Sequence, residues 1–291
     1  MTPLSRRTPS AESQPTLCDD AGMTVRPAHF TQTAEDTFQP TANAQSSWGA
    51  DHLNGPALAG LAATVLDDRY GDDDFLPARL TVDLFRRARG VPTVVSTRLI
   101  RDGRRVRNAE CEIVQDGVAV VRATVVQYRR SSPPLGEEWS TAPSFTPPSL
   151  DPARYTYMGS DQGEWSDSIA DHQNASRKRF LSQPIDVVEG RKNPPFASAA
   201  MTAEHTSLVT NLGSAGIGYI NGDLTVGLVR LPRGDWIGVQ ADSHWAADGI
   251  SVGTSTLFDE DGPFGSGMVT AVGNPAAHID FTSNDHRPGL R

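Results

Sequence analysis

An internal repeat constrains the fold of this chain more than any other feature of its sequence. Three landmarks recur in the same order at offsets of 144, 146 and 145 residues: Leu80-Thr-Val-Asp-Leu-Phe-Arg86 and Leu224-Thr-Val-Gly-Leu-Val-Arg230, Asp102-Gly103 and Asp248-Gly249, and Asp116-Gly117 and Asp261-Gly262. Asp-Gly pairs alone are common turn signals, but a shared order at a near-constant offset indicates one origin. Because the period is about half of the 291 residues, it is too long for a solenoid, and we interpret it as a duplicated domain.

Both halves show the same predicted layout. A helix comes first, near residues 55–67 and 197–212, with apolar residues at helical spacing and few charges, which is typical of a buried helix. Alternating strands joined by tight turns follow it, and further opening strands are expected near 36–48 and 176–190. The predicted strands after the helices are 80–86, 92–101, 105–115 and 118–128, then 219–230, 235–246, 249–259 and 264–273. This order predicts an α+β fold in which an antiparallel sheet curls around each helix.

The domain layout follows from composition. Residues 1–22 are rich in Ser, Thr, Pro and charge, so we expect a disordered leader, with Met23 as a candidate true start. Residues 23–135 are predicted to form the N-terminal domain, 136–160 a linker and 161–291 the C-terminal domain, because residues 131–150 carry two Pro pairs. A single sheet of this kind would leave an open edge strand, so we expect the two sheets to pair edge to edge.

Charge and residue content argue against several classes of protein. A formal charge of -9 without a basic stripe argues against a nucleic-acid partner. No apolar run approaches the ~18 residues of a membrane span, and the start does not read as a signal peptide. The two cysteines, Cys18 and Cys111, form neither a disulfide framework nor a metal site. We therefore predict a cytoplasmic protein without metal or other cofactor, and further homo-oligomerisation stays open.

Several motifs resemble those of the acyl-CoA thioesterases with a double hotdog fold, closest to the bacterial thioesterase II group. They are Trp48, His52-Leu-Asn-Gly-Pro56, Leu80-Thr-Val-Asp-Leu84, Arg101-Asp-Gly103, Gln115-Asp-Gly117, Asn221-Gly-Asp-Leu-Thr-Val226, Gly234-Asp-Trp236 and Phe258-Asp-Glu-Asp-Gly262. The resemblance spans roughly residues 25–290. It implies tandem hotdog domains, each with its sheet around a central helix, and an acyl thioester, such as acyl-CoA, as the substrate.

The resemblance also implies a catalytic set. In thioesterase II relatives the site looks like an Asp on the second-half helix, a Thr on the next strand and a Gln on the last strand, which together orient a water at the thioester carbonyl. The repeat landmarks align these positions with Glu204, Asn221 and Thr270, all of different residue type. Glu204 also has support of its own, since a carboxylate on a buried helix has a raised pKa suited to a general base. The alternative is a solvated or arginine-paired Glu204, a strand-end Asn221 and an ordinary strand residue at Thr270.

The segment before the first helix supplies candidate substrate-binding residues, namely His52, Asn54 and Gly55. Free N–H groups at a helix start attract negative charge, and the resemblance implies that this region polarises the thioester carbonyl as an oxyanion hole does. The alternative is a helix entry loop in which Asn54 is the N-cap.

Three functions remain open from the sequence, of which a hotdog hydratase ranks last, because neither His52 nor His205 has the Asp-x-x-x-x-His spacing that the resemblance implies for that reaction. The first is an acyl-CoA thioesterase-like hydrolase, in which water attacks an acyl thioester. The second is a non-catalytic hotdog protein that binds acyl-CoA or a lipid-like ligand, which the three changes of residue type favour. The acyl chain length, the head group and the pathway are not readable from the sequence.

Overall fold

A computed structural model describes residues 26–49, 51–141 and 143–283, so the predicted leader 1–22 lies outside the described residues. The elements of the first half are β1 (Ala28–Ala34), β2 (Thr37–Pro40), η1 (Ala42–Ala44), α1 (Gly55–Tyr70), β3 (Phe75–Leu84), β4 (Thr93–Asp102), β5 (Val106–Gln115) and β6 (Val118–Arg129). The strand expected near 36–48 is therefore in part wrong: β2 ends at Pro40, and β1 forms earlier, in a segment whose sequence shows no clear alternation.

The second half begins with short strands and then repeats the long meander. Its elements are β7 (Thr156–Ser160), β8 (Gly163–Ser166), η2 (Ala170–His172), β9 (Lys178–Ser182), β10 (Asp186–Val188), α2 (Pro195–Glu204), α3 (Thr206–Asn211), β11 (Leu212–Gly213), β12 (Gly216–Ile217), β13 (Tyr219–Asn221), β14 (Asp223–Leu228), β15 (Ile237–Ala247), β16 (Ile250–Asp259) and β17 (Gly262–Gly273). The single helix expected over 197–212 is thus divided in two at His205.

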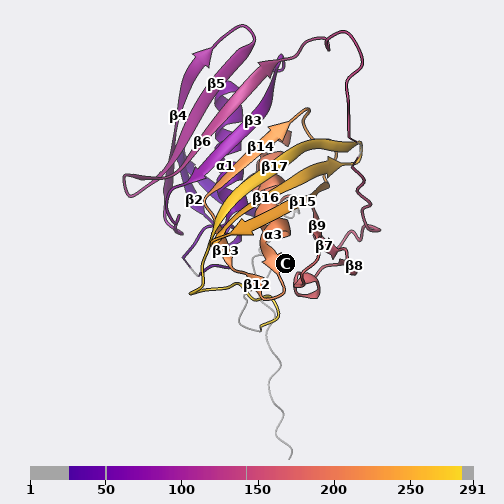
Figure 1. The fold of residues 1–291 in the computed structure, drawn as a ribbon. Helices are drawn as coiled ribbons and strands as arrows, with labels where there is room; N and C mark the ends of the chain where they lie inside the picture. The colour runs from indigo at the N-terminus through magenta and orange to yellow at the C-terminus, as the bar shows by residue number, and fades with distance from the viewer. Residues whose placement is uncertain (1–25, 50, 142, 284–291) are drawn as a thin grey trace, which may run out of the picture.

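The long strands join into one sheet of 15 strands in the order β10-β1-β2-β4-β5-β6-β3-β14-β17-β16-β15-β9-β7-β8, with β13 beside β17. Figure 1 shows the first-half strands continuing directly into those of the second half. Where β3 meets β14 the two copies of the repeated Leu-Thr-Val motif pair with each other, with Thr81 opposite Thr225. This pairing joins the halves edge to edge, as we expected from the open edge strand that a single sheet of this kind would leave.

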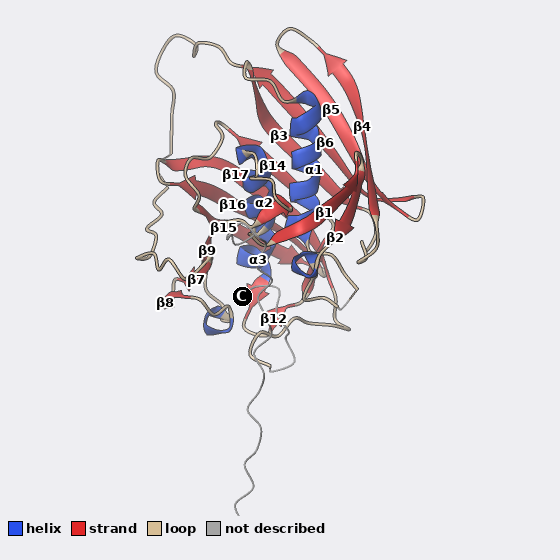
Figure 2. Cartoon of the chain, turned by 180° about the vertical axis from the view of Figure 1, so that it is seen from behind, coloured by secondary structure: helices blue, strands red, loops and turns tan. Residues whose placement is uncertain are grey.

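The sheet is antiparallel at every pairing except that of β1 with β10, and its curved inner face covers the helices (Figure 2). Ten consecutive residues of α1, Ala57 to Leu66, are buried, which agrees with the small, apolar composition of this segment. Helix α1 packs closely on α2, since a Cβ at Gly60 would lie 2.7 Å from Met201 Cγ. The core therefore lies between the helices and the sheet, and the helix contact brings residues of both halves together.

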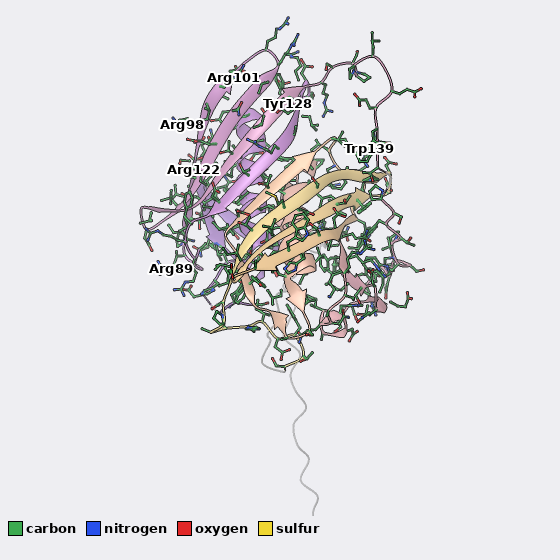
Figure 3. All side chains as sticks on the ribbon, in the orientation of Figure 1. Arg89, Arg98, Arg101, Arg122, Tyr128 and Trp139 are labelled. Carbon is green, nitrogen blue, oxygen red and sulfur yellow. The ribbon has the colours of Figure 1, made fainter. Side chains whose placement is uncertain are left out.

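The outer face of the first-half sheet carries several charged side chains. Arg98, Arg101 and Arg122 point away from the core (Figure 3), and Arg98 and Arg122 form ion pairs with Glu110 and Glu112 of β5. The alternate residues of β5, among them Cys111, are buried against the helix. The predicted hairpin turns are also present: Asp116 and Asp248 have φ of 50° and 51°, each followed by a glycine of positive φ, as a two-residue hairpin requires.

Candidate active site

A cavity of about 800 Å³, here called the central cavity, lies between the start of α1 and the junction of α2 with α3. Its walls come from both halves of the chain and combine apolar side chains with polar ones. Five of the six residues that the sequence singled out line it: His52, Asn54, Gly55, Glu204 and Asn221. The fold thus gathers in one place groups that are separated by up to 169 residues in the sequence.

Glu204 lies at the end of α2 and meets the first residue of α1. A Cβ on Gly55 would lie 2.0 Å from Glu204 Oε1 and 2.2 Å from its Cδ, so only a glycine permits the carboxylate to rest there. Asn221 Nδ2 donates a hydrogen bond of 3.1 Å to Glu204 Oε1. The carboxylate is therefore held between a helix N-terminus and an amide donor, and its partner is not an arginine.

Burial raises the pKa of Glu204 to about 7, although the hydrogen bond from Asn221 favours the charged form and acts in the opposite direction. The side chain is partly accessible from the central cavity and enclosed by protein on its other sides. A carboxylate with a pKa near neutrality is a better proton acceptor than an exposed glutamate, because its conjugate acid is weaker. These are the properties that a general base needs.

Asn54 caps the helix that points at Glu204. Its Oδ1 accepts a hydrogen bond of 2.8 Å from Ala57 N, while its Nδ2 donates to the carbonyl oxygens of Asn43 and Gln45. The side chain is thus occupied by the protein, as the N-cap alternative stated. Since Pro56 has no N–H and Ala57 is capped, Gly55 is the residue at the helix start whose N–H is used neither by the cap nor by an intrahelical hydrogen bond.

His52 lies at the rim of the central cavity, where its Nε2 is 3.0 Å from Arg87 Nη1. Partial burial lowers the pKa of His52 below its usual range, and the Arg87 cation lowers it further. Arg86 and Arg87 also line the cavity and are exposed to solvent. This rim is therefore cationic and suits an anionic part of a ligand.

Two histidines, buried His29 and half-buried His205, complete the cavity wall, and the sequence analysis did not single out His29. His29, on β1, donates from Nδ1 to the carbonyl oxygen of Asn43 at 3.0 Å when neutral, and burial lowers the pKa of His29 to about 4. His205 stacks on Phe180 with ring centroids 4.5 Å apart, and burial lowers its pKa to about 4 as well. Both rings are neutral near pH 7. No sequence pattern points to His29, because β1 contacts the site only through tertiary packing.

Thr270 does not join the other candidates. Its backbone N–H donates to Asp223 Oδ1 at 2.8 Å and its hydroxyl to Asp223 Oδ2. Its neighbours on the same face of β17, Met268 and Val272, are exposed, whereas Val269 and Ala271 are buried. The side chain thus projects from the outer face of the sheet, and the expected convergence of Glu204, Asn221 and Thr270 on one water is not present.

We expect Thr270→Val to keep kcat of the thioester hydrolysis that the resemblance implies within about threefold of wild type, because the side chain is outside the central cavity. The lost hydrogen bond to Asp223 should lower the free energy of unfolding by about 1 kcal/mol. Steady-state kinetics and urea unfolding measure both quantities. A loss of turnover above about a hundredfold in a folded variant would restore Thr270 to the catalytic set.

Within the described ranges, no three His, Cys, Asp or Glu side chains gather as metal ligands do. None of the helices in the same ranges is long and apolar enough to cross a membrane. The polar groups of the central cavity include the carboxylate of Glu204, amides, imidazoles, hydroxyls and the cationic rim, a set that can activate water and bind a polarised carbonyl.

Solved structures with the same architecture show that this chain has a hotdog fold. A hotdog protein of unknown function from Alicyclobacillus acidocaldarius is 16% identical, with a TM-score of 0.61 over 85% of this chain and 96% of its own. An acyl-CoA thioesterase II from Mycobacterium marinum is also 16% identical, with a TM-score of 0.58 over 86% and 96%. A tesB protein from Mycobacterium avium subs paratuberculosis is 16% identical, with a TM-score of 0.59 over 84% of this chain and 96% of its own. At this identity the likeness shows the fold alone.

Family models that match the sequence identify the family within this fold. The model of the acyl-CoA thioesterase N-terminal domain matches residues 44–128, and that of the acyl-CoA thioesterase C-terminal domain matches residues 130–270. The chain therefore belongs to the acyl-CoA thioesterase family, and thioester hydrolysis is its class of activity. No curated protein sequence matches the chain.

Proposed function

We propose that this protein hydrolyses acyl-CoA thioesters in the central cavity, with Glu204 as the general base. One observation carries the assignment: the Glu204 carboxylate, with its pKa near 7, lies against the first residue of α1 inside the central cavity. A site for acyl transfer to water requires a base next to a group that stabilises an oxyanion. Glu204 and the Gly55 amide meet that requirement side by side.

The reaction proceeds in two steps. A water hydrogen-bonded to Glu204 attacks the thioester carbonyl carbon as the carboxylate takes one of its protons, which forms a C–O bond and an oxyanion. The oxyanion then collapses, the C–S bond breaks, and the leaving thiolate takes the proton back from Glu204. The products are a free carboxylic acid and the thiol of coenzyme A, and Glu204 returns to its starting state.

The start of α1 stabilises the oxyanion. The Gly55 N–H precedes the first intrahelical hydrogen bond, and the helix N-terminus carries a partial positive charge. A donor of this kind is typically worth about 100- to 1,000-fold in kcat. Asn54 acts as a positioning residue, because it caps the helix and leaves the Gly55 amide for the ligand.

Asn221 orients the base. Its Nδ2 donates to Glu204 Oε1, so the other carboxylate oxygen is left to accept from water. The resemblance placed Asn221 at a position where relatives carry a threonine, and both residue types supply a hydrogen-bond donor. Asn221 is therefore assigned as a second member of the catalytic set.

Release of free thiol from a panel of acyl-CoAs, from acetyl-CoA to palmitoyl-CoA, tests this function against ligand binding without chemistry. We expect the wild-type protein to release thiol from at least one chain length far above the rate in buffer. Tight binding of acyl-CoA without release of thiol at any chain length would contradict the proposal and favour the binding module.

The internal repeat supports a finer proposal about architecture. We propose two tandem hotdog units, 23–135 and 161–291, joined by the segment 136–160. The last residues of this segment form β7, which pairs with β9 of the second unit, so the free linker is shorter than 136–160. The self-pairing of the Leu-Thr-Val motif supports this division, because a duplicated domain pairs around a pseudo-twofold axis as a homodimer does. A cytoplasmic location and a role in lipid metabolism are parts of the same proposal.

A further inference from the structure

Two arginines at the rim of the central cavity have no acidic partner among the described residues. Arg86 and Arg87 follow β3, and both are exposed and line the cavity. In the described ranges the Arg86 side chain forms no ion pair or hydrogen bond, and the only polar contact of the Arg87 guanidinium is with the ring of His52. By contrast, Arg98 and Arg122 of the same half are each paired with a glutamate. The two guanidinium groups at the rim are therefore available to an anionic ligand.

The rim lies within reach of a ligand held at the proposed base. Glu204 meets Gly55, and His52 precedes Gly55 by three residues, which span at most about 11 Å when fully extended. The ring of His52 in turn lies 3.0 Å from Arg87 Nη1. Because all of these residues line one cavity, a ligand with a flexible arm between its thioester and its anionic groups can bind at the base and at the rim together.

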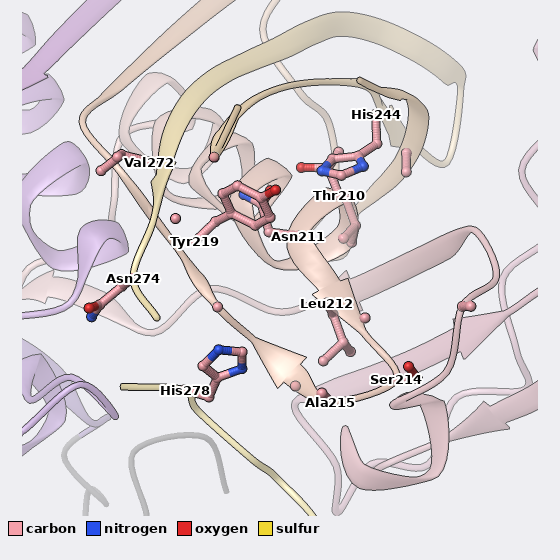
Figure 4. Close-up of a pocket in the computed structure, with 18 of the residues that line it drawn as sticks. Thr210, Asn211, Leu212, Ser214, Ala215, Tyr219, His244, Val272, Asn274 and His278 are labelled. Atoms are coloured by element: carbon pink, nitrogen blue, oxygen red, sulfur yellow. The ribbon is translucent and has the colours of Figure 1, made fainter. Parts of the chain in front are cut away.

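A second large pocket suits an anion less well. It opens beside Tyr219 at the end of α3 and has a volume of about 1000 Å³ (Figure 4). Histidines aside, the charged residues that line it are Arg177, Asp242 and Asp248, and Arg177 is already paired with Asp161. The two carboxylates repel an anion there, whereas the rim of the central cavity attracts one.

An exposed aromatic ring lies next to the two arginines. Phe85 lines the same cavity, and 49% of its surface is exposed although the Arg122 guanidinium lies over its ring, 5.5 Å from the centroid. An exposed ring beside arginines is typical of sites that stack a nucleobase and bind its phosphates. This combination therefore favours a nucleotide over a simple anion such as a carboxylate.

We propose that Phe85, Arg86 and Arg87 hold the nucleotide end of the thioester's carrier, with phosphates on the two arginines and the base against the Phe85 ring. Coenzyme A is the carrier with this chemistry, because a flexible pantetheine arm joins its thiol to a phosphorylated adenine nucleotide. The three residues thus select the leaving group, whereas Glu204 acts at the carbonyl. This inference rests on the proposed function, for which it names the residues that determine carrier specificity.

The test compares decanoyl-CoA with decanoyl-phosphopantetheine, which lacks the nucleotide, and decanoyl-pantetheine, which lacks every phosphate. We expect kcat/KM of the wild-type protein to be about tenfold higher for decanoyl-CoA than for either shorter substrate, because exposed charge pairs and a stacked base each add a modest amount. The difference should lie mainly in KM, since these groups are remote from the reacting carbonyl. Raising the ionic strength from about 0.05 M to about 0.5 M should reduce it, because salt screens exposed charges.

The double substitution Arg86→Gln with Arg87→Gln should bring the kcat/KM ratio of decanoyl-CoA to decanoyl-pantetheine close to one. Its matched control is Arg104→Gln with Arg105→Gln, which changes the net charge equally at two adjacent exposed arginines outside the central cavity. The control should keep the wild-type ratio, so a loss of preference cannot come from net charge alone.

Phe85→Leu should lower the kcat/KM ratio of decanoyl-CoA to decanoyl-phosphopantetheine, because leucine offers no ring on which a base can stack. Tyr128→Leu is the control, since it removes another exposed ring, on β6 and outside the central cavity, and it should keep the ratio.

The outcomes separate this inference from the function on which it rests. If decanoyl-phosphopantetheine or decanoyl-pantetheine matches decanoyl-CoA in kcat/KM with the wild-type protein, the inference is overturned and hydrolysis stays intact. If no substrate is hydrolysed, the proposed function fails, and calorimetric Kd values of coenzyme A then decide the inference. Weaker binding to the Arg86 and Arg87 double variant than to wild type and to its control would support it, and equal Kd values would overturn it. The wild-type ratios are informative even if a variant fails to fold.

Discussion

Replacing Glu204 with Gln is expected to lower kcat by about 100- to 10,000-fold, the usual contribution of a general base. Glutamine keeps the shape of the side chain and an oxygen that accepts from Asn221, but it cannot take a proton from water. KM should change little, because the cavity wall is preserved. Steady-state kinetics on the best acyl-CoA of the panel measures both, and Glu164→Gln, an exposed change remote from the cavity, is the matched control.

The pH profile gives the same prediction a second readout. Since burial raises the pKa of Glu204 to about 7, kcat/KM of the wild type should fall as the pH drops below about 7, where the carboxylate is protonated. The residual activity of Glu204→Gln should lack this decline. A wild-type profile that is flat between pH 5 and 8 would mean that Glu204 is not the base.

Stability distinguishes a catalytic from a structural carboxylate. The folded-state pKa of Glu204 lies above the unfolded value of 4.5, so the favourable contribution of its neutral form is complete below about pH 4.5 and lost as the pH rises through about 7. At pH 8 the charged carboxylate therefore opposes folding, and Glu204→Gln should melt at the same temperature as wild type or higher. A lower melting temperature with intact turnover would assign Glu204 a structural role.

Gly55→Ala should cost about 100-fold in kcat/KM with little change in melting temperature. The added Cβ would lie 2.0 Å from Glu204 Oε1, so the carboxylate must turn away from the helix start. A displacement of about 1 Å at a reacting group is enough for a loss of this size. The fold should tolerate the change, because the colliding atoms form the end of a flexible side chain and alanine suits a helix better than glycine does.

Gly60→Ala provides the matched control on the same helix. There the added Cβ would lie 2.7 Å from Met201 Cγ and 2.9 Å from Val187 Cγ2, in the packed core between α1 and α2. We expect this variant to lose about 1–3 kcal/mol of unfolding free energy through overpacking while its folded fraction stays active. Wild-type turnover in Gly55→Ala would show that the contact between Gly55 and Glu204 is unimportant for the reaction.

The sequence determined the features of this protein that depend on local chemistry. The repeated landmarks and alternating runs located most of the long strands and α1, because side-chain periodicity and Asp-Gly turns act over a few residues. The positive φ at Asp116 and Asp248 confirms two of these turns. The carboxylate of Glu204 was also recognisable, since its apolar helical neighbours made burial predictable.

Only the tertiary structure decided how the site is assembled. The contact of Glu204 with Gly55 joins residues from the two halves, and the break at His205 and the place of His29 depend on packing that no local pattern records. Thr270 shows the reason most clearly. Its position was counted from Gly262, but β16 and β17 shift register between Leu257 and Phe258, and a shift of one residue moves a side chain to the opposite face of a sheet. Residue spacing is a property of the chain, whereas the face that a strand residue occupies depends on its pairing with strands elsewhere in the sequence.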